Sequence, residues 1–289
     1  MPVNDDLGKR MKENYENVSK TRLVKRMPVA IRLDGKAFHT FTKGFHKPFD
    51  DILMRTMHYT MKYLCENIQG CAFGYTQSDE ITLILKDYSK LETSAWFDYE
   101  VQKLCSISAS MATLAFNKHF KYEVDLYTDM ISYEDDVTEE DVKYCKTIFN
   151  AYLKGAMFDA RCFNIPREEV VNLIYWRQLD AVRNSIQMVG QANFSQKQLH
   201  GKSCNMIQDM LLQEKGINWN NYPTASKRGC CCVKNHYSTY GTLVYPGEFG
   251  EWVIDYDIPT FKGEARYYLE KFLKADDEKT EIEIKMGVI

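Results

Sequence analysis

Residues Ile31 to Phe41 read I-R-L-D-G-K-A-F-H-T-F, in which an alternating apolar run gives way to an Asp-Gly pair. Val29, Ile31 and Leu33 alternate with residues 30, 32 and 34, which is the period of a half-buried β-strand. The Asp34-Gly35 pair then interrupts the pattern. The sequence therefore predicts a strand that ends on a carboxylate.

A second stretch, Phe73 to Leu85, reads F-G-Y-T-Q-S-D-E-I-T-L-I-L. Residues 73–76 and 81–85 have the composition of two hairpin arms, with Gln77-Ser78-Asp79-Glu80 at the tip. If the two predicted strands lie in one sheet, Asp34 and Asp79 meet at one edge. Such carboxylates bind hard divalent cations, and two ions about 3.5–4 Å apart support phosphoryl or nucleotidyl displacement. Each motif alone is also an ordinary turn sequence.

The residues after Asp34 favour the functional interpretation over a plain turn. Gly35 lets the backbone approach a ligand closely. Five cationic or titratable side chains follow within one short segment: Lys36, His39, Lys43, His46 and Lys47. The combination indicates a site for phosphate groups beside the acidic edge.

The bulk composition narrows the class of protein. The chain has 289 residues, 45% of them hydrophobic, and a net charge of −3. A nucleic-acid surface would therefore have to be a local basic patch. The nine cysteines are scattered without a C-x-x-C pair, and no signal peptide or membrane-spanning run is present. We expect a cytoplasmic protein with no membrane partner, and a buried strand at Cys230-Cys231-Cys232.

Helical spacing is clear in several segments. Helices are expected over residues 50–68 with Asp50 as N-cap, over 93–120, and over 166–190 with Pro166 at the start. Ser195 and Ser203 open two short helices, and Gly216 ends the second. Residues 1–26 form a helical arm with a basic end. The order strand, helix, strand, strand opens a ferredoxin-like unit.

An acidic run lies in the middle of the chain: Glu134, Asp135, Asp136, Glu139, Glu140 and Asp141. Residues 138–141 read Thr-Glu-Glu-Asp, which is typical of a helix start. We expect a solvated surface helix in an insertion over residues 121–154.

The ordered motifs resemble the tRNA-His guanylyltransferase superfamily, the 3′–5′ nucleotide polymerases. They are R-L-D-G-K-x-F-H-x-F, Lys47-Pro48, Y-x-Q-S-D-E, F-D-x-R at 158–161, W-R-Q-x-D at 176–180 and K-R-G at 227–229. The resemblance implies an α+β fold, a polymerase-palm-like (ferredoxin-like) antiparallel sheet with packed helices. We assign residues 1–240 to the catalytic domain and 241–289 to a peripheral C-terminal region.

The resemblance also implies the chemistry. ATP activates a 5′-monophosphate RNA, and the 3′-hydroxyl of an incoming GTP or other nucleoside triphosphate attacks the activated phosphate. Asp34 and Asp79 are expected to bind two Mg²⁺ ions, with the Gly35 carbonyl as a third ligand and Glu80 ligating or orienting the site. Lys47 matches the lysine of 5′ activation. The residues expected to line the nucleotides are Gly35, Lys36, Ala37, Phe38, His39, Ser78 and Lys103.

The partners implied are tRNA and nucleoside triphosphates, with a homotetramer as the assembly. Cations and polar residues outside the acidic edge are candidates for RNA contact: Lys20, Arg22, Lys25, Arg183, Asn184, Lys197, His200, Lys202, Lys227 and Arg228.

Residues 182–185 depart from the pattern of the family. Enzymes dedicated to tRNA-His carry His-Ile-Asn-Asn there, whereas this chain has Val-Arg-Asn-Ser. An aliphatic Val182 offers a base edge neither donor nor acceptor. We therefore predict template-dependent repair of 5′-truncated tRNAs of several kinds. The alternatives are a dedicated tRNA-His guanylyltransferase that adds G at position −1, a palm-type nucleotidyl cyclase, and a tRNA-binding protein without catalysis. The intact acids argue against the last.

Overall fold

A single antiparallel sheet forms the centre of the molecule. The computed structural model describes residues 6–133, 136–238 and 242–278. The strands are β1 (Val29–Gly35), β2 (Cys71–Gln77), β3 (Glu80–Leu85), β4 (Phe158–Asn164), β5 (Cys230–Lys234) and β6 (Trp252–Asp255). Their order is β4-β1-β3-β2-β5-β6, with every neighbouring pair antiparallel.

The first four strands confirm the expected ferredoxin-like unit. Strand β1 leads through α3 (Asp51–Asn67) to the β2–β3 hairpin, and α4 (Val101–Ser132) precedes β4. The two residues Ser78 and Asp79 connect the hairpin arms, close to the predicted tip. The triple cysteine lies in β5 and is fully buried, as predicted.

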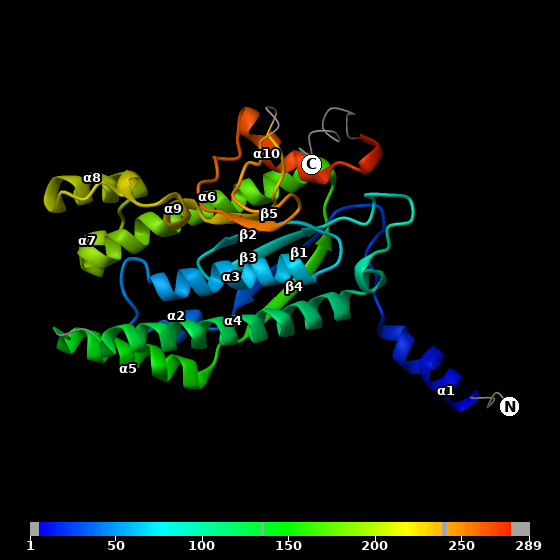
Figure 1. The fold of residues 1–289 in the computed structure, drawn as a ribbon, viewed down its shortest axis with the longest axis horizontal. Helices are drawn as coiled ribbons and strands as arrows, with labels where there is room; N and C mark the ends of the chain where they lie inside the picture. Colours follow the sequence, from blue (N-terminus) through cyan, green and yellow to red (C-terminus); the bar gives the residue numbers. More distant parts are fainter. Residues whose placement is uncertain (1–5, 134–135, 239–241, 279–289) are drawn as a thin grey trace.

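Helices cover both faces of the sheet (Figure 1). Val29, Ile31 and Leu33 point into a core with α3 and α4. Ala30 lies in the opposite core, with side chains of α6 (Arg167–Asn193) and of α10 (Tyr267–Glu270). The alternation read from the sequence therefore reflects two buried faces, because each face has its own helical layer.

The prediction of a peripheral C-terminal region is wrong for the described residues up to 278. Strand β6 extends the central sheet by pairing with β5. Phe261, Leu269 and Leu273 are at most 1% exposed and pack in the core beside α6. The cause is sheet extension: β5 presents an unpaired edge, which a distant strand covers.

Several helix boundaries follow the predicted caps. Asp50 accepts a hydrogen bond from the Leu53 amide at 2.9 Å. Ser195 and Ser203 cap α7 (Gln196–Leu199) and α8 (Cys204–Lys215), and Gly216 ends α8 in the left-handed conformation. Helices α6 and α8 share a third apolar cluster with Phe194, beyond the sheet (Figure 1).

The helix predicted over 93–120 differs at both ends. A short 3₁₀ turn, Trp96–Tyr99, stands before it, and Phe97 and Asp98 adopt positive φ. The helix α4 then begins at Val101 and continues to Ser132, into the predicted insertion. The core that α4 shares with the sheet and with α5 extends past residue 120, because Val124 and Ile131 are buried.

Helix α5 (Glu139–Lys154) begins where predicted, with a capping box between Thr138 and Asp141. The helix lies at the surface as expected, with Glu139 and Glu140 exposed, but its inner face is not solvated, since Tyr144, Ile148 and Ala151 are buried in the main core. Glu134 and Asp135 of the acidic run lie outside the described residues.

The N-terminal arm is helical up to Ser19, through α1 (Asp6–Met11) and two short helical segments, Lys12–Glu16 and Asn17–Ser19. It projects from one end of the molecule (Figure 1). The basic end is not helical: Arg22 forms a β-bridge with Glu100. Short helices α2 (Phe38–Phe41) and α9 (Thr224–Arg228) complete the described fold. Among the described residues, no helix has the length and apolarity to cross a membrane.

Candidate active site

Two carboxylates meet at one edge of the sheet. Asp34 lies near the end of β1, and Asp79 lies in the turn between β2 and β3. The Gly35 amide donates to the Asp79 carbonyl at 3.1 Å, which joins the two segments directly. The predicted juxtaposition of Asp34 and Asp79 is therefore present.

The charge of this pair is not compensated by a protein cation within the described ranges, since no ion pair there involves Asp34 or Asp79. Burial raises the pKa of Asp79, and the negative charge of Asp34 raises it further. Hydrogen bonds from its own backbone and from Ser78 Oγ, the latter at 3.0 Å, act in the opposite direction. Two carboxylates in a partly desolvated position could hold a hard cation, which would offset their mutual repulsion.

The donor set fits Mg²⁺, because this ion takes oxygen ligands and is often bound by one or two carboxylates plus substrate phosphates and waters. Asp34, Asp79 and the Gly35 carbonyl would hold it. Among the described residues no cluster of three or more His, Cys, Asp or Glu side chains forms a complete protein cage. The remaining ligands would therefore come from solvent and nucleotide.

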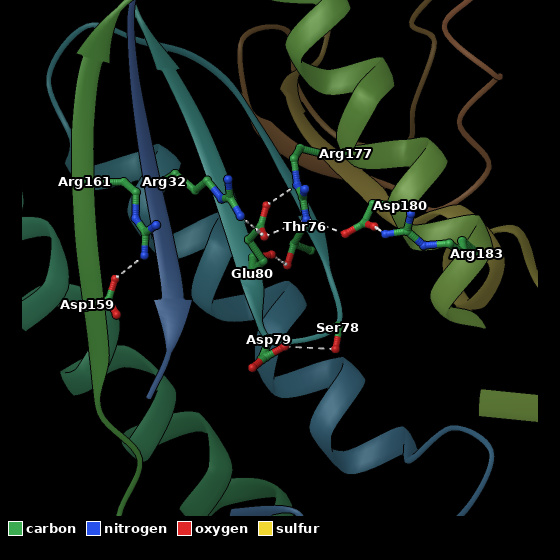
Figure 2. Close-up of polar contacts among 10 residues, drawn as sticks. All are labelled: Arg32, Thr76, Ser78, Asp79, Glu80, Asp159, Arg161, Arg177, Asp180 and Arg183. Carbon is green, nitrogen blue, oxygen red and sulfur yellow. Dashed lines mark hydrogen bonds and ion pairs between the residues drawn. The ribbon is translucent and has the colours of Figure 1, made fainter. Parts of the chain in front are cut away.

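Glu80 follows Asp79 but its carboxylate is occupied by arginines (Figure 2). Arg177 donates from Nε at 2.7 Å and from NH2 at 2.9 Å, one bond to each oxygen. Arg32 donates a further bond at 2.9 Å. Glu80 is predicted either to bind metal or to orient the site. Its contacts with two arginines fit the orienting role, which leaves Asp34 and Asp79 as the candidate metal ligands. Arg177 was not predicted as a site residue, because its partner lies 97 positions away in the chain.

The segment after Gly35 turns sharply over the end of the sheet. Ala37 has φ of 55°, and α2 begins at the next residue. A side chain on Gly35 would meet the Phe38 ring at 2.3 Å, so only glycine fits there. Lys36 and His39 are exposed. Phe38 is expected to line the nucleotide, but its side chain is buried and packs edge-on against Phe116 and Phe158 in the core, so such a contact would have to come from its backbone.

A pocket of about 80 Å³ opens beside the acidic turn. Helix α3 supplies apolar walls through Leu53, Met54 and Met57, while Ser78 and Asn184 supply polar groups. Its lining, apolar with a few polar groups, resembles that of a small-molecule site, but its volume is below the roughly 300–1,000 Å³ of a typical ligand pocket.

Lys47 is exposed and lies in a separate cleft, opposite Glu139 and Glu140 at the start of α5. The structure does not bring Lys103 to the acidic edge. Lys103 is exposed near the beginning of α4, with its amine 5.7 Å from the Phe97 ring centroid. One α4 residue that contacts the acidic end of the sheet is Thr113, which accepts a hydrogen bond from the Phe158 amide. Ten helical residues separate the two, or about 15 Å.

The N-terminal cations predicted to bind RNA are engaged in ion pairs. Lys20 lies 3.3 Å from Glu16. Arg22 and Lys25 both pair with Asp98. Exposed pairs of this kind are weak, but they reduce the net positive charge of the arm.

The cations near α6 divide into two groups. Lys227 is buried and donates to the Asn220 carbonyl at 2.6 Å, so the prediction that it contacts RNA is replaced by a structural role. Arg228 bonds to Thr260, and Arg183 pairs with Asp180. Arg183 is exposed despite its ion pair, and Asn184, Lys197, His200 and Lys202 are exposed as well.

A palm-like antiparallel sheet with two carboxylates at one edge is an arrangement suited to metal-assisted displacement at phosphorus. The profile described as tRNAHis guanylyltransferase matches residues 8–166 of the chain. The chain therefore belongs to the tRNAHis guanylyltransferase family, whose members are nucleotidyltransferases.

Relatives and solved structures agree with this assignment. The chain is 28% identical to the tRNA(His) guanylyltransferase of Saccharomyces cerevisiae over 70% of this chain and 80% of the relative. It is 29% identical to an uncharacterized protein of Acanthamoeba polyphaga mimivirus, over 82% and 80%. A bacterial tRNA(His) guanylyltransferase-like protein solved in complex with ATP superposes with a TM-score of 0.74 and 39% identity, covering 92% of this chain and 98% of that one. A GTP complex of a protein with the same description has a TM-score of 0.70 and 37% identity, over 93% and 99%.

Proposed function

We propose that the protein adds nucleotides to the 5′ ends of truncated tRNAs in the 3′–5′ direction, guided by the opposing strand, after ATP-dependent 5′ activation. The observation that carries this proposal is the environment of residues 182–185 on α6. Val182 packs on an apolar cluster. Ser185 is buried, donates to the Lys227 carbonyl at 3.1 Å and accepts from Trp219 Nε1 at 3.2 Å.

Arg183 pairs with Asp180, which leaves Asn184 as the exposed, unpaired polar side chain of these four within the described structure. Recognition of an unpaired base needs stacking or edge hydrogen bonds. The amide of Asn184 alone offers little stacking and few edge hydrogen bonds. Arg183 on a phosphate would position the RNA but would not read its sequence. These side chains favour repair of several tRNAs over a dedicated reader of the histidine anticodon.

The proposed site residues act on phosphate groups. Two Mg²⁺ ions, held by Asp34, Asp79 and the Gly35 carbonyl, would neutralise charge that develops on the transferring phosphate. Glu80, fixed by two arginines, orients the turn that carries Asp79. Lys36, His39 and Ser78 lie at or beside the same edge and are proposed to bind triphosphate oxygens.

Nucleotide binding by similar proteins supports the proposed substrates, since those proteins were solved with ATP and with GTP. We place the base in the pocket beside Ser78, whose apolar α3 wall suits a planar ring. Lys47 is proposed to serve the activation step.

A homotetramer is proposed as the assembly. Helices α4 and α5 and the segment before β4 expose large apolar side chains, among them Leu114 at 64%, Leu153 at 65% and Met157 at 58%. Such surfaces are common at subunit contacts. The mass of the purified protein by light scattering tests this proposal.

The deciding experiment uses labelled transcripts that lack the first nucleotide, one of tRNA-His and one of another tRNA, with ATP, nucleotides and Mg²⁺. Repair predicts extension of both at rates within about tenfold, with the added nucleotide chosen by the opposing base. A preference of about a hundredfold for the histidine anticodon corresponds to about 2.7 kcal/mol and would establish the dedicated guanylyltransferase instead. Asp79→Asn is the control for contaminating activity.

The same reactions distinguish the proposed enzyme from a nucleotidyl cyclase. A cyclase converts a nucleoside triphosphate to a cyclic product without RNA, whereas the proposed enzyme forms no such product. A cyclic nucleotide in the absence of tRNA would refute the proposal.

A further inference from the structure

The Asp50 carboxylate ties three segments of the chain together. One oxygen accepts from the Leu53 amide at 2.9 Å and caps α3. The other accepts from the His46 amide at 3.0 Å and from the Tyr144 hydroxyl at 2.6 Å. Asp50 is 5% exposed, so these bonds are made away from bulk water. A single side chain therefore joins the start of α3, the loop that carries Lys47, and α5.

Tyr144 holds the same loop by a second contact. Its ring stacks on His46 with centroids 3.6 Å apart and planes inclined by 13°. Burial, and then the charge of Asp50, raise the pKa of the Tyr144 phenol well above its ordinary value, so the hydroxyl stays a donor. Lys47 is thus flanked by a fixed His46 on one side and a fixed Asp50 on the other.

Lys47 is exposed, so the backbone of the loop decides where its side chain can reach. A displacement of about 1 Å at a reacting group can reduce a rate by about a hundredfold. Removal of the Tyr144 hydroxyl leaves Asp50 with its two amide donors and leaves the α3 cap intact. It removes the hydrogen-bonded link between Asp50 and α5, while the stacking of the ring on His46 remains.

We infer that Tyr144 is a positioning residue for Lys47, and that α5 is a working part of the 5′-activation step. This inference rests on the proposed role of Lys47. The inference gives α5, which lines the Lys47 cleft, a role in activation. The Tyr144 hydroxyl acts through Asp50 and the loop, and is not proposed to touch nucleotide or RNA.

The test compares Tyr144→Phe with the wild type and with Tyr152→Phe. Tyr152 lies on the same helix and packs on Phe149, and its hydroxyl makes no hydrogen bond within the described structure. Each protein is given truncated tRNA with a 5′-monophosphate or a 5′-triphosphate. The kcat, the KM for ATP and the amount of adenylylated RNA are measured, together with the melting temperature.

The 5′-triphosphate RNA already carries its leaving group and bypasses activation. Tyr144→Phe is expected to lower kcat on 5′-monophosphate RNA by about tenfold or more, with less adenylylated RNA, and to change the rate on 5′-triphosphate RNA by less than about twofold. Tyr152→Phe is expected to change neither rate. Asp50→Asn, which retains a good N-cap, is expected to show the same selective loss as Tyr144→Phe.

A structural role alone predicts that both RNAs lose activity equally and in step with melting temperature, and this result overturns the inference. Unchanged rates in Tyr144→Phe also overturn it. If Lys47→Ala is selectively defective while Tyr144→Phe is not, the positioning role fails and the proposed function survives. A wild type that extends neither RNA removes the proposed function, and the positioning role with it.

Discussion

Replacement of Arg177 by methionine is the sharpest test of how the turn at Asp79 is held. Arg177 and Glu80 have side chains that are 6% and 7% exposed, and their contact is bidentate. Methionine keeps the apolar stem but removes the partner of a buried charge. Loss of one member of a buried ion pair costs about 3–5 kcal/mol. Because Arg32 still bonds to Glu80, we expect a decrease in the free energy of unfolding of about 3 kcal/mol.

Urea titration of the wild type and of Arg177→Met measures this difference directly. Arg183→Met is the matched control: its guanidinium pairs with Asp180 on the same helix, but the side chain is 66% exposed. An exposed pair contributes about 0–1 kcal/mol. A cost for Arg177→Met no larger than that of Arg183→Met would contradict the role assigned to the buried pair.

The pH dependence of the same measurement gives a second check. Burial raises the pKa of Glu80, and the charge of Arg177 is the largest opposing influence. Without Arg177 the folded-state pKa rises further above the unfolded value, and the folded state of the variant binds more protons. Its stability therefore falls as pH rises through that window. The deficit of Arg177→Met should be smaller at pH 5 than at pH 8, and an equal deficit would show that Glu80 does not titrate as argued.

Three further predictions concern the acidic edge and the activation step. Asp34→Ala or Asp79→Ala should lower the rate of every nucleotidyl transfer by about a thousandfold or more while the protein stays folded, as its melting temperature shows. Near-normal turnover in either variant would remove the two-metal proposal. The folded-state pKa of Asp79 is raised, so the metal-free protein should lose stability as pH rises from the ordinary aspartate range through the pKa of Asp79. Mg²⁺ should offset this loss. A melting temperature that does not change with Mg²⁺ at neutral pH would count against the site. Lys47→Ala should fail on 5′-monophosphate tRNA and retain activity on 5′-triphosphate RNA, and an equal loss on both would make Lys47 a general phosphate contact.

Local patterns were sufficient for much of the fold. The alternation around Ile31 predicts a strand, and Asp79 in a four-residue tip predicts a hairpin, because side-chain period and turn chemistry depend on near neighbours. The caps at Asp50, Thr138, Ser195 and Ser203 are likewise local, since each side chain bonds to an amide three residues away. The two acids of the candidate site were found in the same way, as carboxylates at the ends of apolar runs.

What the sequence alone did not reveal depends on residues far apart in the chain. The partner of Glu80 is Arg177 on α6, and the partner of Asp50 is Tyr144 on α5. Asp98 forms ion pairs with Arg22 and Lys25 of the N-terminal segment. Strand β6, from the C-terminal region, extends the sheet by pairing with β5. The motifs of this protein therefore determined which residues gather at the acidic edge. Only the tertiary structure decided which charges there are paired. A charged side chain is neutralised by an opposite charge within a few ångströms, and the fold can bring that partner from any distance along the chain.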